Sequence, residues 1–266
     1  MMTLSYSDTL PDVFEFDATH GRLTSSGKGG IVRVYDCAGG EWVLGNFSKS
    51  KRLWVNGQTC FLIDSWDGSV LAYDLGSREQ LFACNQYAFL PGGSGPYLIG
   101  GTYDSTRLAL CGGLFDWTSQ IQIWQRPDTS LLQFIEGALF DRTNDVIQQL
   151  EIATGKTIWK VDVSAAGKVH RLIGNYAGCL WAALQDASET HLLLGVDLES
   201  GAVRFEGDAF HIGYSFATHL IHPQDRVLSL YGLSAYAPET NYREFDAGSG
   251  ALLREGLYLR HFAKSS

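Results

Sequence analysis

The sequence is poor in charged residues, proline and methionine, and it contains no long apolar run. Charged side chains make up 18% of the 266 residues, whereas 45% are hydrophobic, and there are 6 Pro and 2 Met. This composition excludes an intrinsically disordered chain. The longest apolar stretches have the length of a strand, so we expect no transmembrane helix. Residues 1–17 contain no Lys or Arg and no long apolar run, so we also expect no secretory signal.

Basic residues and cysteines are few as well. The chain has 20 Lys and Arg against 29 Asp and Glu, a formal net charge of −9. This balance disfavours binding to nucleic acid or to an anionic membrane, which requires a positive surface. The five cysteines are an odd number, and no pair has the Cys-x-x-Cys spacing typical of zinc and thioredoxin-like sites. We interpret them as buried thiols and expect a cytoplasmic protein.

A short pattern recurs along the chain, in which an apolar run ends in an acidic residue and a turn with Gly or Ser precedes the next run. The pattern occurs at residues 32–40, 71–77, 149–156, 196–201 and 245–250. An Asp side chain can accept hydrogen bonds from the backbone of such a turn, and Gly supplies the positive φ that the turn needs. Each copy therefore predicts a β-hairpin.

The spacing of these hairpins is typical of a β-propeller. The acidic residues Asp36 and Asp74 lie 38 positions apart, and Asp197 and Asp246 lie 49 apart. The 77 positions between Asp74 and Glu151 leave room for two units, and we assign the diverged turn of the missing unit to residues 115–118. Units of about 40 residues with four strands each are typical of propeller blades.

Two segments resemble known propellers. Residues 22–36 resemble the middle of a WD repeat, and residues 151–159 resemble a blade hairpin of the quinoprotein-like propellers. The resemblance to this superfamily implies an all-β fold, which we predict to be a single β-propeller domain of six blades with four antiparallel strands each. Seven blades, or two β-sandwiches, are the alternatives. The predicted blades span roughly residues 11–47, 48–85, 86–126, 127–163, 164–208 and 209–262. We further expect an end segment, residues 13–16 or 256–262, to complete a sheet shared by the two ends.

The sequence offers little that predicts catalysis. The quinoprotein-like resemblance brings to mind a quinone cofactor, but the chain is shorter than those dehydrogenases and lacks their adjacent cysteine pair, so we expect no cofactor and no enzyme activity. His219 and His222 are three positions apart and would point to opposite faces of a strand, which disfavours a metal site. The glycine-rich residues 92–96 lack the Lys of a phosphate-binding loop, and we interpret them as a loop between blades.

One face of the predicted propeller carries mostly acidic loops with aromatic residues among them. These are the loops between the second and third strands of the blades. Aromatic side chains among charges are typical of protein-binding surfaces, although Asp is also an ordinary turn residue. The predicted partner-binding residues are Asp64, Trp66, Asp67, Tyr103, Asp104, Asp141 and Asp186.

These observations favour a non-enzymatic, monomeric propeller that binds another protein, with neither nucleic acid nor membrane as a partner. The chain is similar in this respect to bacterial immunity proteins, which neutralise a toxin, and an acidic inhibitor would associate quickly with a basic toxin. The alternatives are a scaffold or assembly factor of the WD-repeat type, and a propeller that binds a small ligand or sugar, or hydrolyses a substrate, in its axial pocket.

Overall fold

The structure is a computed structural model in which sixteen stretches of the chain are described. They are residues 13–17, 22–26, 31–36, 40–46, 51–64, 67–101, 103–104, 109–110, 112–126, 131–176, 178–188, 190–210, 216–222, 227–232, 239–246 and 248–259. Within these stretches all regular secondary structure is β-strand, in six four-stranded sheets and one two-stranded hairpin. The chain divides into two compact units, residues 1–137 with Ile152–Gly155 and the remainder from Ala138 onward.

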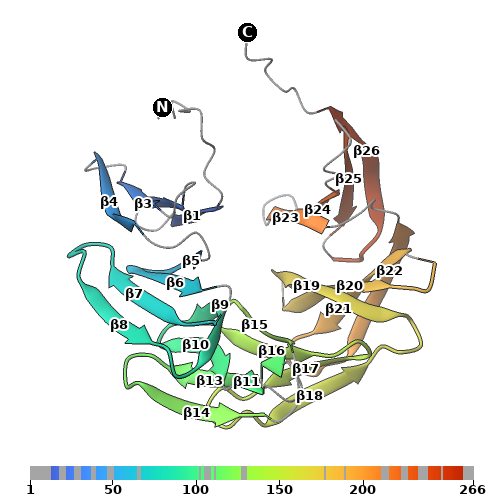
Figure 1. Ribbon diagram of the computed structural model, residues 1–266. Coiled ribbons are helices and arrows are strands. Elements are labelled where there is room, and N and C mark those ends of the chain that lie inside the picture. The colour runs from blue at the N-terminus through green and yellow to red at the C-terminus, as the bar shows by residue number, and fades with distance from the viewer. Residues whose placement is uncertain are drawn as a thin grey trace. The chain divides into compact units, whose positions relative to one another are not determined.

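The first unit contains three four-stranded antiparallel sheets, coloured blue to green in Figure 1. The first sheet consists of β1 (Val13–Asp17), β2 (Arg22–Ser26), β3 (Ile31–Asp36) and β4 (Gly40–Asn46). The second consists of β5 (Lys51–Asn56), β6 (Thr59–Asp64), β7 (Val70–Asp74) and β8 (Gln80–Cys84). The third consists of β9 (Ala88–Ser94), β10 (Tyr97–Gly101), β13 (Gly113–Asp116) and β14 (Ile121–Gln125). The hairpin of β11 (Tyr103–Asp104) and β12 (Ala109–Leu110) interrupts the third sheet in sequence, and β15 (Leu131–Ile135) completes the unit's strands.

The second sheet shows why these strands are apolar on both faces. Successive side chains of a strand point to opposite sides of the sheet. Phe61 and Ile63 of β6 accordingly pack with Phe89, Leu98 and Phe115 of the third sheet. The alternate residues Cys60 and Leu62 pack with Val32 and Val34 of the first sheet. The second sheet therefore has a hydrophobic core on each face, which explains the nearly continuous apolar run of β6.

The second unit has two complete four-stranded sheets and a run of three further strands (Figure 1). The three are β16 (Ala138–Arg142), β17 (Val146–Leu150) and β18 (Thr157–Asp162). The next sheet consists of β19 (Lys168–Tyr176), β20 (Cys179–Gln185), β21 (His191–Asp197) and β22 (Val203–Phe210). The last consists of β23 (Phe216–His222), β24 (Val227–Gly232), β25 (Glu239–Asp246) and β26 (Leu252–Leu259).

The core of the second unit centres on Trp181 of β20, which is fully buried. Its ring lies among Ile173, Ala183 and Leu193 of its own sheet and Phe245 of β25. The sheet of β19–β22 is therefore joined to the sheet of β23–β26 by buried apolar side chains. Burial of each large side chain of this kind stabilises the fold by about 1.5–3 kcal/mol.

One local prediction made from the sequence was wrong. Residues 92–96 do not link two blades, because they form the hairpin between β9 and β10, with Gly95 at φ +56° in its turn. β1 pairs with β2 and β26 pairs with β25, each within its own unit, and the sheet predicted to be shared by the two ends stays a prediction. The blade boundaries predicted from the sequence remain predictions.

Candidate interaction surface

Four of the described turns that follow the third strand of a sheet are closed by aspartate side chains, as the repeat predicted. Asp74 accepts hydrogen bonds from the backbone N–H groups of Gly76 and Ser77, at 2.8 and 2.6 Å. Asp246 does the same for Gly248 and Ser249, at 2.9 and 2.8 Å. The diverged turn also behaves this way, because Asp116 accepts from the N–H groups two and three positions on. These carboxylates therefore have a structural role.

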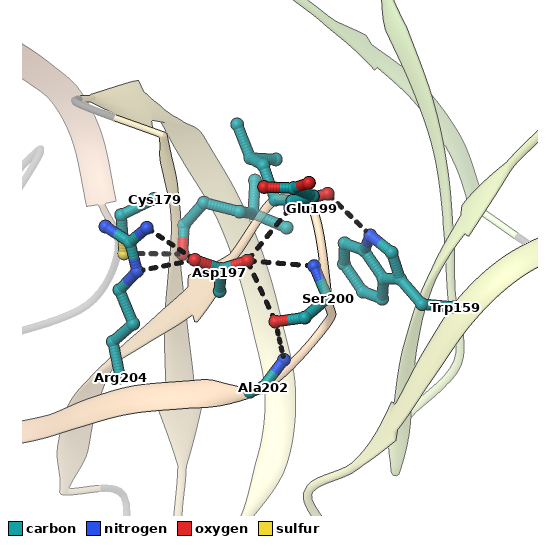
Figure 2. Close-up of polar contacts among 9 residues, drawn as sticks. Trp159, Cys179, Asp197, Glu199, Ser200, Ala202 and Arg204 are labelled. Carbon is teal, nitrogen blue, oxygen red and sulfur yellow. Dashed lines mark hydrogen bonds and ion pairs between the residues drawn. The ribbon is translucent and has the colours of Figure 1, made fainter.

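Asp197 makes the most extensive of these turn interactions (Figure 2). Its Oδ1 accepts hydrogen bonds from the backbone of Glu199 and Ser200, at 3.0 and 2.8 Å, and from the hydroxyl of Ser200. Its Oδ2 accepts from Nε of Arg204 at 2.8 Å and forms an ion pair with the same guanidinium. The hydrogen bonds from Ser200 and then the one from Arg204 hold the pKa of Asp197 far below its usual value.

Two tryptophan rings, each from the fourth strand of a repeat, pack on a turn of the following repeat. The indole Nε1 of Trp159, in β18, donates a hydrogen bond to the carbonyl oxygen of Leu198 at 2.8 Å (Figure 2). The ring lies so close to Gly201 that a Cβ there would come within 2.8 Å of it. Trp124 of β14 repeats the arrangement with the carbonyl oxygen of Ile152, at 2.7 Å, and with Gly155. A fixed ring-on-glycine contact therefore recurs within each unit.

The predicted partner-binding residues of the first unit lie around two connections. Asp64 is half-buried at the end of β6, and Asp67 is exposed in the loop before β7, where it accepts a hydrogen bond from the N–H of Ser69 at 2.7 Å. Tyr103 and Asp104 form β11, in the connection between β10 and β13. Trp66 lies outside the described residues. Asp67 is thus exposed, and its carboxylate also accepts a hydrogen bond within its own turn.

The two predicted residues of the second unit differ from each other. Asp186 is exposed between β20 and β21, and its Oδ1 accepts hydrogen bonds from the backbone of Ser188 and Thr190, at 2.8 and 2.9 Å. The sequence predicted that Asp141 lies in a loop, and this was wrong. Asp141 lies in β16, where it is 2% exposed. Its Oδ2 accepts a hydrogen bond from Nε2 of Gln148 at 2.6 Å. Because it is buried, Asp141 is not available to attract a partner.

A cluster of arginine and histidine side chains in the second unit was missed by the sequence analysis. Arg142 of β16 donates from Nη1 to the carbonyl oxygen of Val169 at 3.1 Å. His170 follows Val169 in β19, and its ring meets that of the buried His191 at a centroid distance of 5.1 Å. Burial and then the charges of Arg142 and Arg171 lower the pKa of His170. No sequence motif marks the cluster, because its members come from three strands.

The described stretches contain no group of three His, Cys, Asp or Glu side chains arranged to hold a metal ion. His219 and His222 both lie in β23, whereas His211 is outside these stretches. A helix long and apolar enough to cross a membrane is not found in the part of the chain that the structure describes.

Comparisons with known proteins agree with this architecture. No protein-family model and no curated protein matches the chain. Among solved structures, the β-propeller domain of Cps50 (Swd1) from Myceliophteria thermophila is 13% identical, with a TM-score of 0.65 over 96% of this chain and 90% of that one. A chain of a mitotic checkpoint complex is 12% identical, with a TM-score of 0.61 over 98% and 88%. Sqt1 of Saccharomyces cerevisiae is 13% identical, with a TM-score of 0.60 over 91% and 72%. The chain therefore has the fold of a β-propeller.

Proposed function

We propose that this protein is a non-enzymatic scaffold that binds a protein partner through the loops of its propeller. The observation that carries this proposal is the likeness in fold, over 98% of this chain, to a chain found in a mitotic checkpoint complex. The internal framework supports it, because tryptophan rings packed on the turns and carboxylates within the turns hold the strands in place. Binding residues are found preferentially on loops that such a rigid scaffold carries.

Asp67 and Asp186 are the predicted contact residues best suited to test the proposal. Both are exposed and lie in connections between the second and third strands of their sheets. Replacement by Asn removes the charge but leaves an oxygen that can accept the turn's hydrogen bonds. We expect Asp67→Asn and Asp186→Asn to reduce the recovery of the partner without changing the melting temperature.

The experiment is an affinity pull-down from the native organism, with quantitative mass spectrometry of the proteins recovered by each variant. Asp74→Asn is the matched control, since Asp74 closes the turn at the other end of β7 through the same type of hydrogen bond. A stoichiometric partner that is lost with Asp67→Asn or Asp186→Asn, but kept with Asp74→Asn, would support the scaffold. Failure to recover any partner would contradict it.

The narrower prediction of a cytoplasmic immunity protein against a basic toxin remains a prediction. It depends on the net charge of −9, which would increase the association rate with a basic partner at low salt. The identity of the recovered protein separates the two functions. A basic toxin encoded beside this gene would favour immunity, whereas a subunit of a larger assembly would favour the scaffold.

A further inference from the structure

Near the start of β19, the backbone of Val169 makes two hydrogen bonds to residues outside its own sheet in the second unit. The N–H of Val169 donates to the carbonyl oxygen of Asn144 at 2.6 Å, and the carbonyl oxygen of Val169 accepts from Arg142 at 3.1 Å. The pairing with β20 then slips, because Val169 faces Leu184 and Arg171 faces Ala183, which leaves His170 as an extra residue. Such a β-bulge redirects side chains, and bulges are common beside functional sites.

The bulge brings positive charge to one place. His170 and Arg171 follow each other in β19, and burial and then the charges of Arg142 and Arg171 lower the pKa of His170. Burial and the charge of Arg171 likewise lower the pKa of Arg142. All three side chains are half-buried, so they remain accessible from solvent. Like charges held together in a partly desolvated place favour an anion as ligand.

The adjacent carboxylate of Asp141 does not pair with Arg142. Asp141 is adjacent to it in β16, and adjacent residues of a strand point to opposite faces of the sheet. Asp141 is instead bound to Gln148 on its own side. Among the described residues, the only hydrogen-bond partner of the Arg142 guanidinium is the carbonyl oxygen of Val169. A guanidinium has five N–H donors, so Arg142 can bind a further acceptor.

We propose that Arg142, His170 and Arg171 form a binding site for a carboxylate on an acidic segment of a partner protein. This arginine–histidine site deepens the proposed scaffold function and depends on it. The planar guanidinium of an arginine matches a carboxylate with two parallel hydrogen bonds. The net charge of −9 disfavours a polyanion such as nucleic acid, whereas a short acidic segment meets much less long-range repulsion.

The test is a fluorescence-anisotropy titration of the full-length protein with a fluorescein-labelled hexaglutamate peptide at low salt. We expect binding that an uncharged hexaglutamine peptide does not reproduce. Arg171→Gln and Arg142→Gln should each weaken it by about tenfold or more, the effect of losing one charge-assisted hydrogen bond. If Arg142→Gln does not fold, Arg142→Lys replaces it in the titration, because lysine keeps the charge and a donor for the carbonyl oxygen of Val169.

The matched control is Arg254→Gln, which removes the same charge from an exposed residue that pairs with Glu244 in the last sheet. It should leave the affinity within about twofold. Equal weakening by Arg254→Gln, or no binding of hexaglutamate, would overturn the site. Tighter binding of a phosphoserine peptide than of hexaglutamate would overturn the carboxylate assignment. Absence of peptide binding together with a recovered partner would refute this site while the scaffold function stands.

Discussion

The indole N–H of Trp159 reaches the carbonyl oxygen of Leu198, 39 positions further along the chain, at 2.8 Å. The ring also covers Gly201 in the same turn. Trp124 has the equivalent relationship with Ile152 and Gly155. These contacts join the fourth strand of one repeat to a turn of the next repeat. Each therefore connects two segments that have no sheet hydrogen bonds with each other.

Loss of this hydrogen bond should destabilise the protein measurably. Trp159→Phe keeps an aromatic ring on Gly201 but removes the donor, leaving the Leu198 carbonyl without it. We expect a loss of about 1–2 kcal/mol in the free energy of unfolding. The measurement is urea denaturation followed by circular dichroism.

The control for this substitution is Trp54→Phe. Trp54 stacks on Phe61 at a centroid distance of 4.8 Å, and its indole makes no hydrogen bond within the described stretches. Trp54→Phe therefore removes the same atoms as Trp159→Phe without removing a hydrogen bond, and it should lower the free energy of unfolding by less. Equal losses for the two variants would show that packing, and not the hydrogen bond, accounts for the stabilisation by Trp159.

Gly201 should tolerate a methyl group less well than Gly57. Both have a positive φ, +72° and +58°, and alanine at either position costs about 1 kcal/mol through its backbone conformation. At Gly57 a Cβ meets nothing within 4 Å, whereas at Gly201 it would meet the Trp159 ring at 2.8 Å. Gly201→Ala should therefore cost a further 1–3 kcal/mol or so, as in other overpacked sites. Thermal unfolding of the two variants compares them directly, and equal melting temperatures would contradict the ring-on-glycine contact.

The repeat was predictable because its turns are local. A carboxylate that binds N–H groups two and three positions away, as Asp197 does, leaves its mark within six residues of sequence. Asp141 was not predictable in this way. It follows an apolar run, as a loop residue would, but its partner Gln148 lies seven positions on, and only the register of β16 with β17 brings them together.

The arginine–histidine site depends on even more distant relationships. The bulge at His170 arises where Val169 is held by Asn144 and Arg142, residues 25 and 27 positions earlier in the chain. Such long-range backbone contacts leave no periodic pattern in the sequence. The contact between the rings of His170 and His191 likewise joins residues that are 21 positions apart.

The cysteines should differ in their reactivity toward alkylating reagents. Cys60 is fully buried, and burial raises the pKa of its thiol. Burial also raises the pKa of Cys179 to about 11. Because the thiolate is the reactive form, both should resist iodoacetamide at about pH 8, whereas the half-buried Cys84 should react faster than these two. Peptide mapping by mass spectrometry, with a urea-denatured sample as control, measures the three rates. Alkylation of Cys60 in the folded protein as fast as of Cys84 would contradict its burial.

The stability of the protein should fall as the pH drops below 6.5, in part through His170. Burial, then Arg142 and Arg171, lower the pKa of His170 below its ordinary value of 6.5, so the folded state binds this proton less readily than the unfolded state. The contribution of His170 to stability is therefore complete above pH 6.5, and it is lost as the pH falls from there through the lowered folded-state pKa.

His170→Gln should flatten this part of the pH profile, and Arg142→Gln should flatten it partly, since Arg142→Gln removes one of the repelling charges. The measurement is the urea midpoint of unfolding between about pH 7.5 and pH 5 for the wild type and each variant. Near pH 8.5 the slopes of the midpoint against pH should coincide for the variants and the wild type, which gives the reference. A wild-type slope that survives His170→Gln unchanged would assign the acid sensitivity to other groups and would place His170 outside the influence of the two arginines.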